Sequence, residues 1–359
     1  MKNRILKPDL RVVFWELTYG CNLKCIHCRA EAGPQRSPDE LSTEEALELI
    51  HRIKEFANPI VVLTGGEPLV RPDIFEIAQA ASRTSLRVAL ATNGTLIDDS
   101  VASRIVDSGI QRVSISLDGA SSVTHDTFRG VPGSYDAAIR GFKALKKLGM
   151  ELQINVTVAK HNLAELPQIM RNAEKMGAHA FHMFLLVPVG CGIQIAQNEE
   201  ITPRQYEEVL RWFYEEMKNS RMEMKATCAP HFFRVRAQLD KEGKKKLRDP
   251  SAGHGGMSGM TRGCLAGSSV CFVSHRGDVY PCGYLPLKAG NVREQPFQQI
   301  WFDSPLFASL RDLSQLKGKC GACEYKFLCQ GCRARAYGIS GDYLNEEPFC
   351  VYEPARMKT

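Results

Sequence analysis

The alternation of short apolar runs with helical patterns over residues 10–186 constrains the fold more than any other feature of the chain. Strands that alternate with helices build parallel sheets with right-handed crossovers. The sequence therefore predicts an α/β fold, with six parallel strands curled into an open or partial (β/α)6 barrel. The predicted strands are 12–15, 60–63, 88–91, 113–117, 152–158 and 181–186, and helices are expected near 43–56, 73–84, 97–108, 134–148, 163–177 and 203–219.

Polar and glycine-rich segments follow the predicted strands. In parallel α/β sheets, ligands bind beyond the carboxyl ends of the strands. Taken singly, each segment could be an ordinary turn. Asn93-Gly94, for example, is a dipeptide typical of turns. Together they predict a ligand site along one rim of the sheet, formed by segments 64–68, 92–94, 118–119 and 188–190 and by the cysteine-rich loop that follows the first strand.

That loop contains Cys21, Cys25 and Cys28 in a Cys-x3-Cys-x2-Cys pattern. A structural zinc site uses four protein ligands, and an ordinary cubane iron–sulfur cluster uses four cysteines. Three thiolates on one loop leave one metal position open. Open positions are typical of metal sites that perform chemistry.

A second group of cysteines lies near the C-terminal end of the sequence. Gly277 precedes one of them by five residues in a segment typical of a hairpin turn. From spacing alone, a zinc ribbon without catalytic activity and a pair of iron–sulfur sites are both consistent with this group, because eight ligands can close two four-ligand sites. The eight cysteines are Cys264, Cys271, Cys282, Cys320, Cys323, Cys329, Cys332 and Cys350.

Composition narrows the class of protein further. We expect a cytoplasmic protein with reduced cysteines, because thirteen cysteines occur without a recognisable secretion signal. No apolar run reaches 18 residues, so no transmembrane segment is predicted. The formal charge of +6 is too small to indicate nucleic-acid binding, but it suits an anionic small substrate.

The cysteine triad together with the Gly-Gly-Glu-Pro motif at 65–68 resembles radical S-adenosylmethionine (SAM) enzymes. The later cysteines are similar to the SPASM domain of that family, except that two residues rather than three separate Cys329 from Cys332. The resemblance implies a barrel of the radical SAM type followed by a small iron–sulfur domain. We expect the barrel at 1–220, a glycine-rich linker and substrate-side segment at 221–262, and the SPASM domain at 263–359.

The resemblance also assigns cofactors. A [4Fe–4S] cluster would bind the triad, and one or, more consistent with the pattern, two auxiliary [4Fe–4S] clusters would bind the later cysteines. One auxiliary cluster would use Cys320, Cys323, Cys329 and Cys350; the other would use Cys264, Cys282 and Cys332, with Cys271 as a possible fourth ligand. The residues expected to bind SAM are Gly65, Gly66, Glu67, Asn93, Ser116, Asp118, Arg129, Val156 and Leu186.

Within the family, the chain is similar to enzymes that decarboxylate iron-coproporphyrin III to haem b. The segments that support this are 225–231, 329–337 and 341–350. The resemblance implies an iron-porphyrin substrate, an external electron donor, and hydrogen abstraction by a radical generated from SAM. Cys228 and His231 are candidate substrate contacts, because thiolate and imidazole are both axial haem ligands.

Two other activities of the family are alternatives. One is a sister enzyme, either a didecarboxysirohaem deacetylase or a haem d1 synthase. The other is a peptide-modifying SPASM maturase, which is less favoured because only twenty residues precede Cys21 and leave little room for a peptide-recognition domain.

Overall fold

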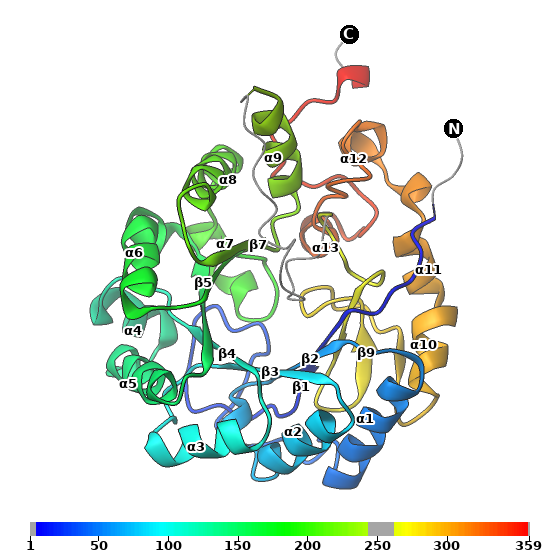
Figure 1. The fold of residues 1–359 in the computed structure, drawn as a ribbon. Coiled ribbons are helices and arrows are strands. Elements are labelled where there is room, and N and C mark those ends of the chain that lie inside the picture. The colour runs from blue at the N-terminus through cyan, green and yellow to red at the C-terminus, as the bar shows by residue number, and fades with distance from the viewer. Residues whose placement is uncertain (1–4, 243–261, 358–359) are drawn as a thin grey trace.

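The structure, a computed structural model, describes residues 5–242 and 262–357, and it forms a single curved sheet surrounded by helices (Figure 1). The strand order is β10-β9-β8-β1-β2-β3-β4-β5-β6-β7. Strands β8 and β1 to β7 run parallel to one another, whereas β9 pairs antiparallel with both β8 and β10. The strands are β1 (Val12–Glu16), β2 (Ile60–Thr64), β3 (Arg87–Thr92), β4 (Arg112–Ser116), β5 (Glu151–Val158), β6 (Ala180–Leu185), β7 (Glu223–Thr227), β8 (Val270–Val273), β9 (Asp278–Tyr280) and β10 (Gly290–Asn291).

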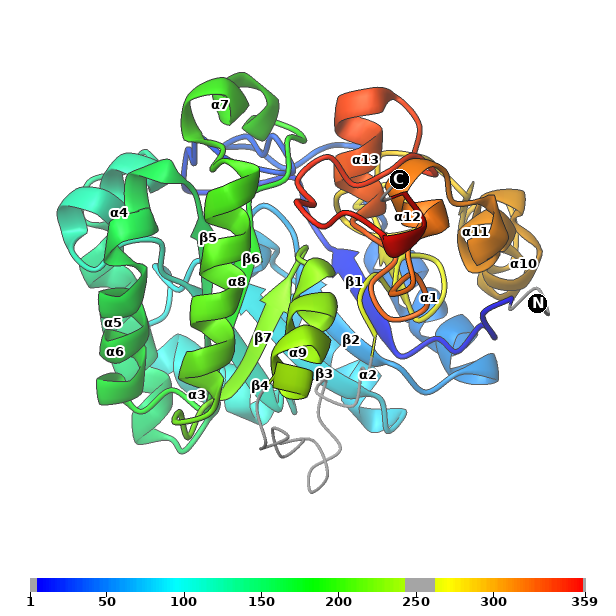
Figure 2. The ribbon, with the colours of Figure 1, turned by 90° about the horizontal axis from the view of Figure 1, so that it is seen from above.

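Helices α1 to α6 and α8 lie on the outer side of the sheet (Figure 1). Helices α7 and α13 lie together at one edge, beyond the carboxyl ends of the parallel strands (Figure 2). The helices are α1 (Thr43–Phe56), α2 (Ile74–Arg83), α3 (Asp99–Asp107), α4 (Ser122–Arg129), α5 (Ser134–Lys147), α6 (Leu166–Met176), α7 (Gly192–Glu199), α8 (Pro203–Met217), α9 (His231–Glu242), α10 (Phe297–Asp303), α11 (Pro305–Arg311), α12 (Gly318–Ala322) and α13 (Arg333–Ser340), with 3-10 turns at Pro68–Val70, Lys160–Glu165, Leu313–Gln315 and Ala355–Met357.

The predicted α/β fold is confirmed, and the six predicted strands correspond to β1 to β6. Their apolar side chains pack against the outer helices in one large core, in which Trp15, Ile154 and Phe213 are completely buried. The first helix begins at a capping box, in which Ser42 and Glu45 each accept a hydrogen bond from the other's backbone N–H. The hairpin predicted around Gly277 is present between β8 and β9.

The sheet continues beyond the six predicted strands. Strand β7 pairs with β6, and β8 pairs in parallel with β1, so the C-terminal segment extends the same sheet. Strand β7 was not predicted, because Glu223 and Lys225 interrupt the apolar residues of this segment. Helices α4 and α7 were also not predicted. Residues 243–261 of the linker and substrate-side segment predicted at 221–262 lie outside the described residues.

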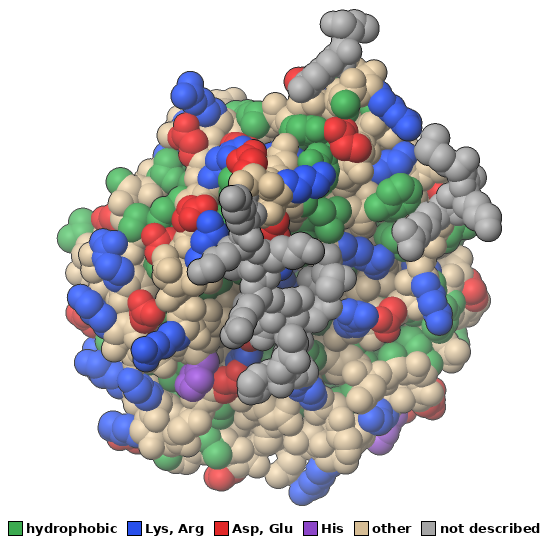
Figure 3. Space-filling model, turned by 45° about the horizontal axis from the view of Figure 1, so that its top comes forward, with side chains coloured by type: hydrophobic (Ala, Val, Ile, Leu, Met, Phe, Trp, Pro, Cys, Tyr) green, Lys and Arg blue, Asp and Glu red, His purple; other side chains and the backbone are tan. Residues whose placement is uncertain are grey.

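Among the described residues, no helix is long and apolar enough to cross a membrane. On the face shown in Figure 3, Lys and Arg side chains alternate with Asp and Glu rather than forming one basic surface. This distribution agrees with the small net charge of the chain.

A buried arginine joins the ends of the first two strands. The Arg71 side chain is 1% exposed, and its Nη1 donates to the carbonyl oxygen of Leu17 at 2.8 Å. Its Nε and Nη2 both donate to the Asp73 carboxylate at 2.8 Å. Because Leu17 directly follows β1 and Arg71 follows the 3-10 turn after β2, this side chain fixes the two rim segments relative to each other.

We predict that Arg71→Met destabilises the protein by about 3 kcal/mol, because it leaves a buried carbonyl and Asp73 without their partner. Denaturant unfolding under anaerobic conditions measures the change. As the control, Arg204→Met removes an exposed ion pair to Glu208 and should change stability by no more than about 0.5 kcal/mol. Equal effects of the two substitutions would contradict the assignment.

Candidate active site

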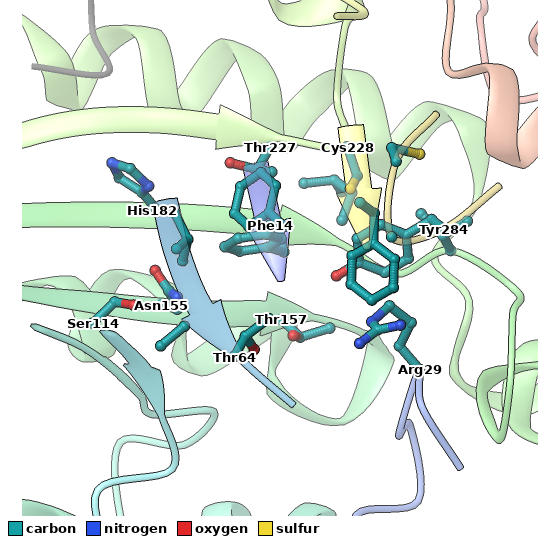
Figure 4. Close-up of a pocket in the computed structure, with 18 of the residues that line it drawn as sticks. Phe14, Arg29, Thr64, Ser114, Asn155, Thr157, His182, Thr227, Cys228 and Tyr284 are labelled. Atoms are coloured by element: carbon teal, nitrogen blue, oxygen red, sulfur yellow. The ribbon is translucent and has the colours of Figure 1, made fainter. Parts of the chain in front are cut away.

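A cavity of about 400 Å³ lies inside the curve of the sheet. Its wall is mainly apolar, and polar side chains project into it from the strands (Figure 4). His182, Asn155 and Ser114 lie toward one end, whereas Arg29, Tyr284 and Cys228 lie toward the other (Figure 4). The volume falls in the range of small-molecule and cofactor sites.

All three triad cysteines line this cavity. Each sulfur accepts a hydrogen bond from an N–H group: Cys21 from Leu23 N at 3.4 Å, Cys28 from Ala32 N at 3.5 Å, and Cys25 from the Arg129 guanidinium at 3.7 Å. Burial raises the pKa of Cys21 to about 12. Such donors favour the thiolate, and a bound cation would overcome the opposing effect of burial.

Two glycines allow the triad loop to pack against the strand ends. A Cβ atom on Gly66 would lie 2.3 Å from the carbonyl oxygen of Gly20, next to Cys21. A Cβ atom on Gly190 would lie 2.6 Å from the carbonyl oxygen of Cys28, and Gly190 also has φ of +56°. Any side chain at position 66 would therefore displace the loop that holds the cysteines.

Six of the nine residues expected to bind SAM line the cavity beside the triad, and three do not. Glu67 is completely buried, and its carboxylate accepts from Thr92 Oγ1 at 2.7 Å and Asn93 N at 2.8 Å. Burial raises the pKa of Glu67 despite these donors. Its observed role is thus to hold the segment that follows β3. The six that line the cavity are Gly65, Gly66, Asn93, Ser116, Arg129 and Leu186; the other three are Glu67, Asp118 and Val156.

Asp118 lies behind the cavity wall and orients Arg129. Its Oδ2 is 2.5 Å from Arg129 Nη2, and its Oδ1 accepts from Thr157 N at 2.7 Å. Burial opposes ionisation of Asp118, but Arg129, His27, His125 and the N–H of Thr157 together outweigh it and keep the pKa of the carboxyl below its usual value. Arg129 therefore presents a compensated positive charge to the cavity beside Cys25.

The charged lining residues of the large cavity are basic. Among the residues that the structure describes, six Lys or Arg side chains line the cavity and no Asp or Glu does. Carboxylates pair with three of these cations from outside the lining, so the charges are held in a largely apolar chamber. The six basic residues are Arg29, Arg112, Arg129, Lys225, Arg262 and Arg333.

A second, smaller cavity is lined by four of the later cysteines. Every one of the four sulfurs accepts a hydrogen bond from an N–H group: Cys320 from Glu347 N, Cys323 from Tyr325 N, Cys329 from Gly331 N and Cys350 from the Arg234 guanidinium. Hydrogen bonds to sulfur are a usual feature of iron–sulfur sites. These four residues are the set that the sequence assigned to one auxiliary cluster.

Cys264, Cys282 and Cys332 line the large cavity instead. Only Gln330 and Gly331 separate Cys329 from Cys332, and both have positive φ, 68° and 66°. The two left-handed residues turn the chain so that Cys329 and Cys332 face different cavities.

The remaining three candidate residues are placed apart from each other. Cys271, the proposed fourth ligand, lies on β8 in the main hydrophobic core and lines neither cavity. Cys228 lines the large cavity. His231 is 1% exposed and lines the second cavity, so it does not reach the same space as Cys228.

The cysteine side chains are too widely spaced to bind a single metal ion. In the described ranges, no three Cys, His, Asp or Glu side chains are close enough together to hold one ion. A cubane cluster is larger than one ion and accepts more widely spaced thiolates. The donor set, thiolates with N–H groups directed at sulfur, therefore fits iron–sulfur clusters better than the zinc-ribbon alternative.

Two family models match the chain. The radical SAM superfamily model matches residues 15–173, and the SPASM iron–sulfur cluster-binding domain matches residues 264–332. The first contains the triad and most of the parallel strands, and the second contains Cys264 to Cys332.

Curated relatives match over nearly the whole length. The chain is 49% identical to the AdoMet-dependent heme synthase of Methanosarcina barkeri, over 96% of this chain and 97% of the relative. It is 47% identical to the AdoMet-dependent heme synthase of Nitratidesulfovibrio vulgaris, over 98% and 94%. A more distant relative, 30% identical over 96% and 88%, is the Fe-coproporphyrin III synthase of Methanosarcina barkeri.

Solved structures share the fold. Streptococcus suis SuiB bound to S-adenosylmethionine superposes with a TM-score of 0.72 at 20% identity, over 98% of this chain and 79% of that one. The enzyme anSMEcpe with bound AdoMet gives 0.69 at 22% identity, over 95% and 94%.

The fold and the cysteine sites thus define an S-adenosylmethionine-dependent iron–sulfur enzyme. The chain belongs to the radical SAM superfamily, among the members that also contain a SPASM domain. Membership implies a [4Fe–4S] cluster with SAM and auxiliary iron–sulfur clusters, and the hydrogen-bonded thiols described above fit these groups.

We predict that Gly66→Ala lowers occupancy of the triad cluster, because the added Cβ atom collides with the backbone of Gly20. Iron and acid-labile sulfide per chain after anaerobic reconstitution measure the loss, which should be about one third of the total if three four-iron clusters bind.

Gly338→Ala serves as the matched control. Its Cβ atom would meet nothing closer than 3.3 Å, so iron and sulfide should remain at the level of the unmodified chain. Full iron content in Gly66→Ala would show that the close approach does not hold the triad loop.

Proposed function

We propose that this chain is an AdoMet-dependent heme synthase that converts two propionate side chains of iron-coproporphyrin III to vinyl groups and gives haem b. The observation that carries this proposal is the lining of the large cavity, which is mainly apolar and, among the described residues, includes six Lys or Arg residues and no Asp or Glu. Relatives with that name match at 47–49% identity over almost the full length.

The lining suits an iron-porphyrin with four propionates. Apolar residues such as Phe14, Phe272 and Leu186 provide surface for the macrocycle, while lysine and arginine provide charge-assisted hydrogen bonds to carboxylates. Because carboxylates outside the lining hold several of these cations in place, the cavity is arranged for anions before any substrate enters.

The residues of the rim would act on the cofactor and substrate in distinct ways. Cys21, Cys25 and Cys28 would hold the [4Fe–4S] cluster, which, with SAM, supplies the radical that abstracts hydrogen from a propionate. Gly65, Gly66 and Asn93 would position the methionine end of SAM beside the triad. The wall of the cavity would exclude water and protect the radical chemistry.

Turnover also needs an external electron donor, which we propose to be a separate reducing protein. The electron that leaves the substrate with CO2 needs an acceptor, which we propose to be an auxiliary cluster. We further propose that the enzyme acts in the cytoplasm. In the structure all thirteen cysteines are free thiols, which agrees with a reducing compartment.

The proposal predicts that the anaerobically reconstituted protein, given SAM, a reductant and iron-coproporphyrin III, yields first a monovinyl product and then haem b. Mass spectrometry of the extracted porphyrins follows both decarboxylations, and omission of SAM is the control. If 5′-deoxyadenosine forms without decarboxylation of this substrate, the proposed function is wrong. Sirohaem-derived substrates and precursor peptides then test the two alternative activities.

We predict that Lys225→Met raises the KM for iron-coproporphyrin III about tenfold, since losing one charge-assisted hydrogen bond costs about 1.5 kcal/mol. Lys225 lies on β7 and lines the cavity. Lys225→Arg keeps the charge and should largely restore the KM. An unchanged KM in Lys225→Met would exclude this lysine from substrate binding.

A further inference from the structure

Four cysteines, not three, surround one end of the large cavity. Cys228, Cys264, Cys282 and Cys332 all line it. Cys228 and Cys282 pack against a small buried cluster that includes Cys332. Cys228 directly follows β7, Cys264 precedes β8, Cys282 follows β9, and Cys332 directly precedes α13.

A backbone contact brings Cys264 to the same place. Its N–H donates to the carbonyl oxygen of Cys329 at 3.1 Å, three residues before Cys332.

The expected fourth ligand, Cys271, faces the opposite side of the sheet. Successive side chains of a strand point to opposite faces. Its neighbours Val270 and Phe272 line the large cavity, so Cys271 points away from it into the helix-covered core.

Cys228 is held at the cavity by an unusual backbone. Its φ is +56°, in the left-handed region that residues with a side chain rarely adopt. Its carbonyl oxygen accepts from Tyr206 Oη at 3.0 Å and from both terminal nitrogens of Arg335, at 3.2 and 3.3 Å. Arg335 is 0% exposed.

The same network fixes Cys332. Arg335 lies in α13, which begins directly after Cys332, and its Nη1 is 3.5 Å from Glu347. Glu347 in turn accepts from the backbone N–H of Cys332 at 2.6 Å. The buried Arg335 thus fixes the position of Cys228 relative to Cys332, although 104 residues of sequence lie between the end of β7 and Cys332.

We propose that Cys228 is the fourth protein ligand of the auxiliary cluster held by Cys264, Cys282 and Cys332. The cluster would then bridge the last parallel strand of the barrel and the SPASM domain at the mouth of the large cavity. Cys271 would be a core residue with no metal role. The proposal concerns cluster ligation and does not depend on which substrate the enzyme uses.

The test compares Cys228→Ala, Cys228→Ser and Cys271→Ala in the full, anaerobically reconstituted enzyme. Mössbauer spectra of ⁵⁷Fe-loaded protein and EPR spectra after mild oxidation report the state of each cluster. We expect Cys228→Ala to lose one cluster or to convert it to a [3Fe–4S] form, because one iron lacks its thiolate. Cys228→Ser should retain four irons with a shifted potential, and Cys271→Ala should match the unmodified enzyme.

Alkylation of the unmodified enzyme provides a measurement without any substitution. Iodoacetamide labelling followed by mass spectrometry should find Cys228 protected in the holoenzyme together with Cys264, Cys282 and Cys332. After chelation of iron, these thiols should become reactive. The proposal is overturned if Cys228 reacts as fast in the holoenzyme as after chelation, or if Cys271→Ala rather than Cys228→Ala loses the cluster. Neither readout depends on decarboxylation, so a failed substrate assay leaves this test intact.

Discussion

The parallel pairing of β8 with β1 is the interaction on which the arrangement of the sites depends. Strand β1 leads into the cysteine triad, and the β8–β9 hairpin is flanked by Cys264 and Cys282. Residues Val12 to Trp15 pair in register with Val270 to Val273, so segments more than two hundred residues apart share one sheet. This pairing brings the triad loop and the SPASM cysteines to the same cavity, a geometry that two independently packed domains would not fix.

The second constraint is the placement of charged side chains at the large, mainly apolar cavity. Arg29, Arg112 and Arg129 project toward the cavity, while Glu16, Glu151, Glu223 and Asp118 pair with them from other positions. Buried cations without partners would be costly, so these carboxylates stabilise the arginines without adding negative charge to the lining. The result is a largely apolar cavity whose charged lining residues are basic, which is consistent with the proposed iron-porphyrin substrate.

The sequence predicted the barrel because β1 to β6 are rich in buried aliphatic residues, which leave a clear pattern. It could not predict β7, whose Glu223 and Lys225 break that pattern. The triad and the glycines beside it were recognisable from spacing. Cys228 was not assigned to a cluster, because an isolated cysteine carries no spacing signal, and its position depends on tertiary contacts to Arg335 and Tyr206. Cys271 was a possible fourth ligand by family resemblance, and a spacing pattern does not take account of the alternation of side chains along β8.

The central claim is that one cavity holds an iron-porphyrin between the triad and the SPASM cysteines. Anomalous diffraction at the iron edge, from anaerobic crystals grown with SAM and iron-coproporphyrin III, tests it most directly. The account predicts three multinuclear iron sites, at the triad, at Cys228 with Cys264, Cys282 and Cys332, and at Cys320 with Cys323, Cys329 and Cys350, together with one isolated iron inside the large cavity. Single-metal peaks at the later cysteines, or a porphyrin iron bound outside the cavity, would contradict it.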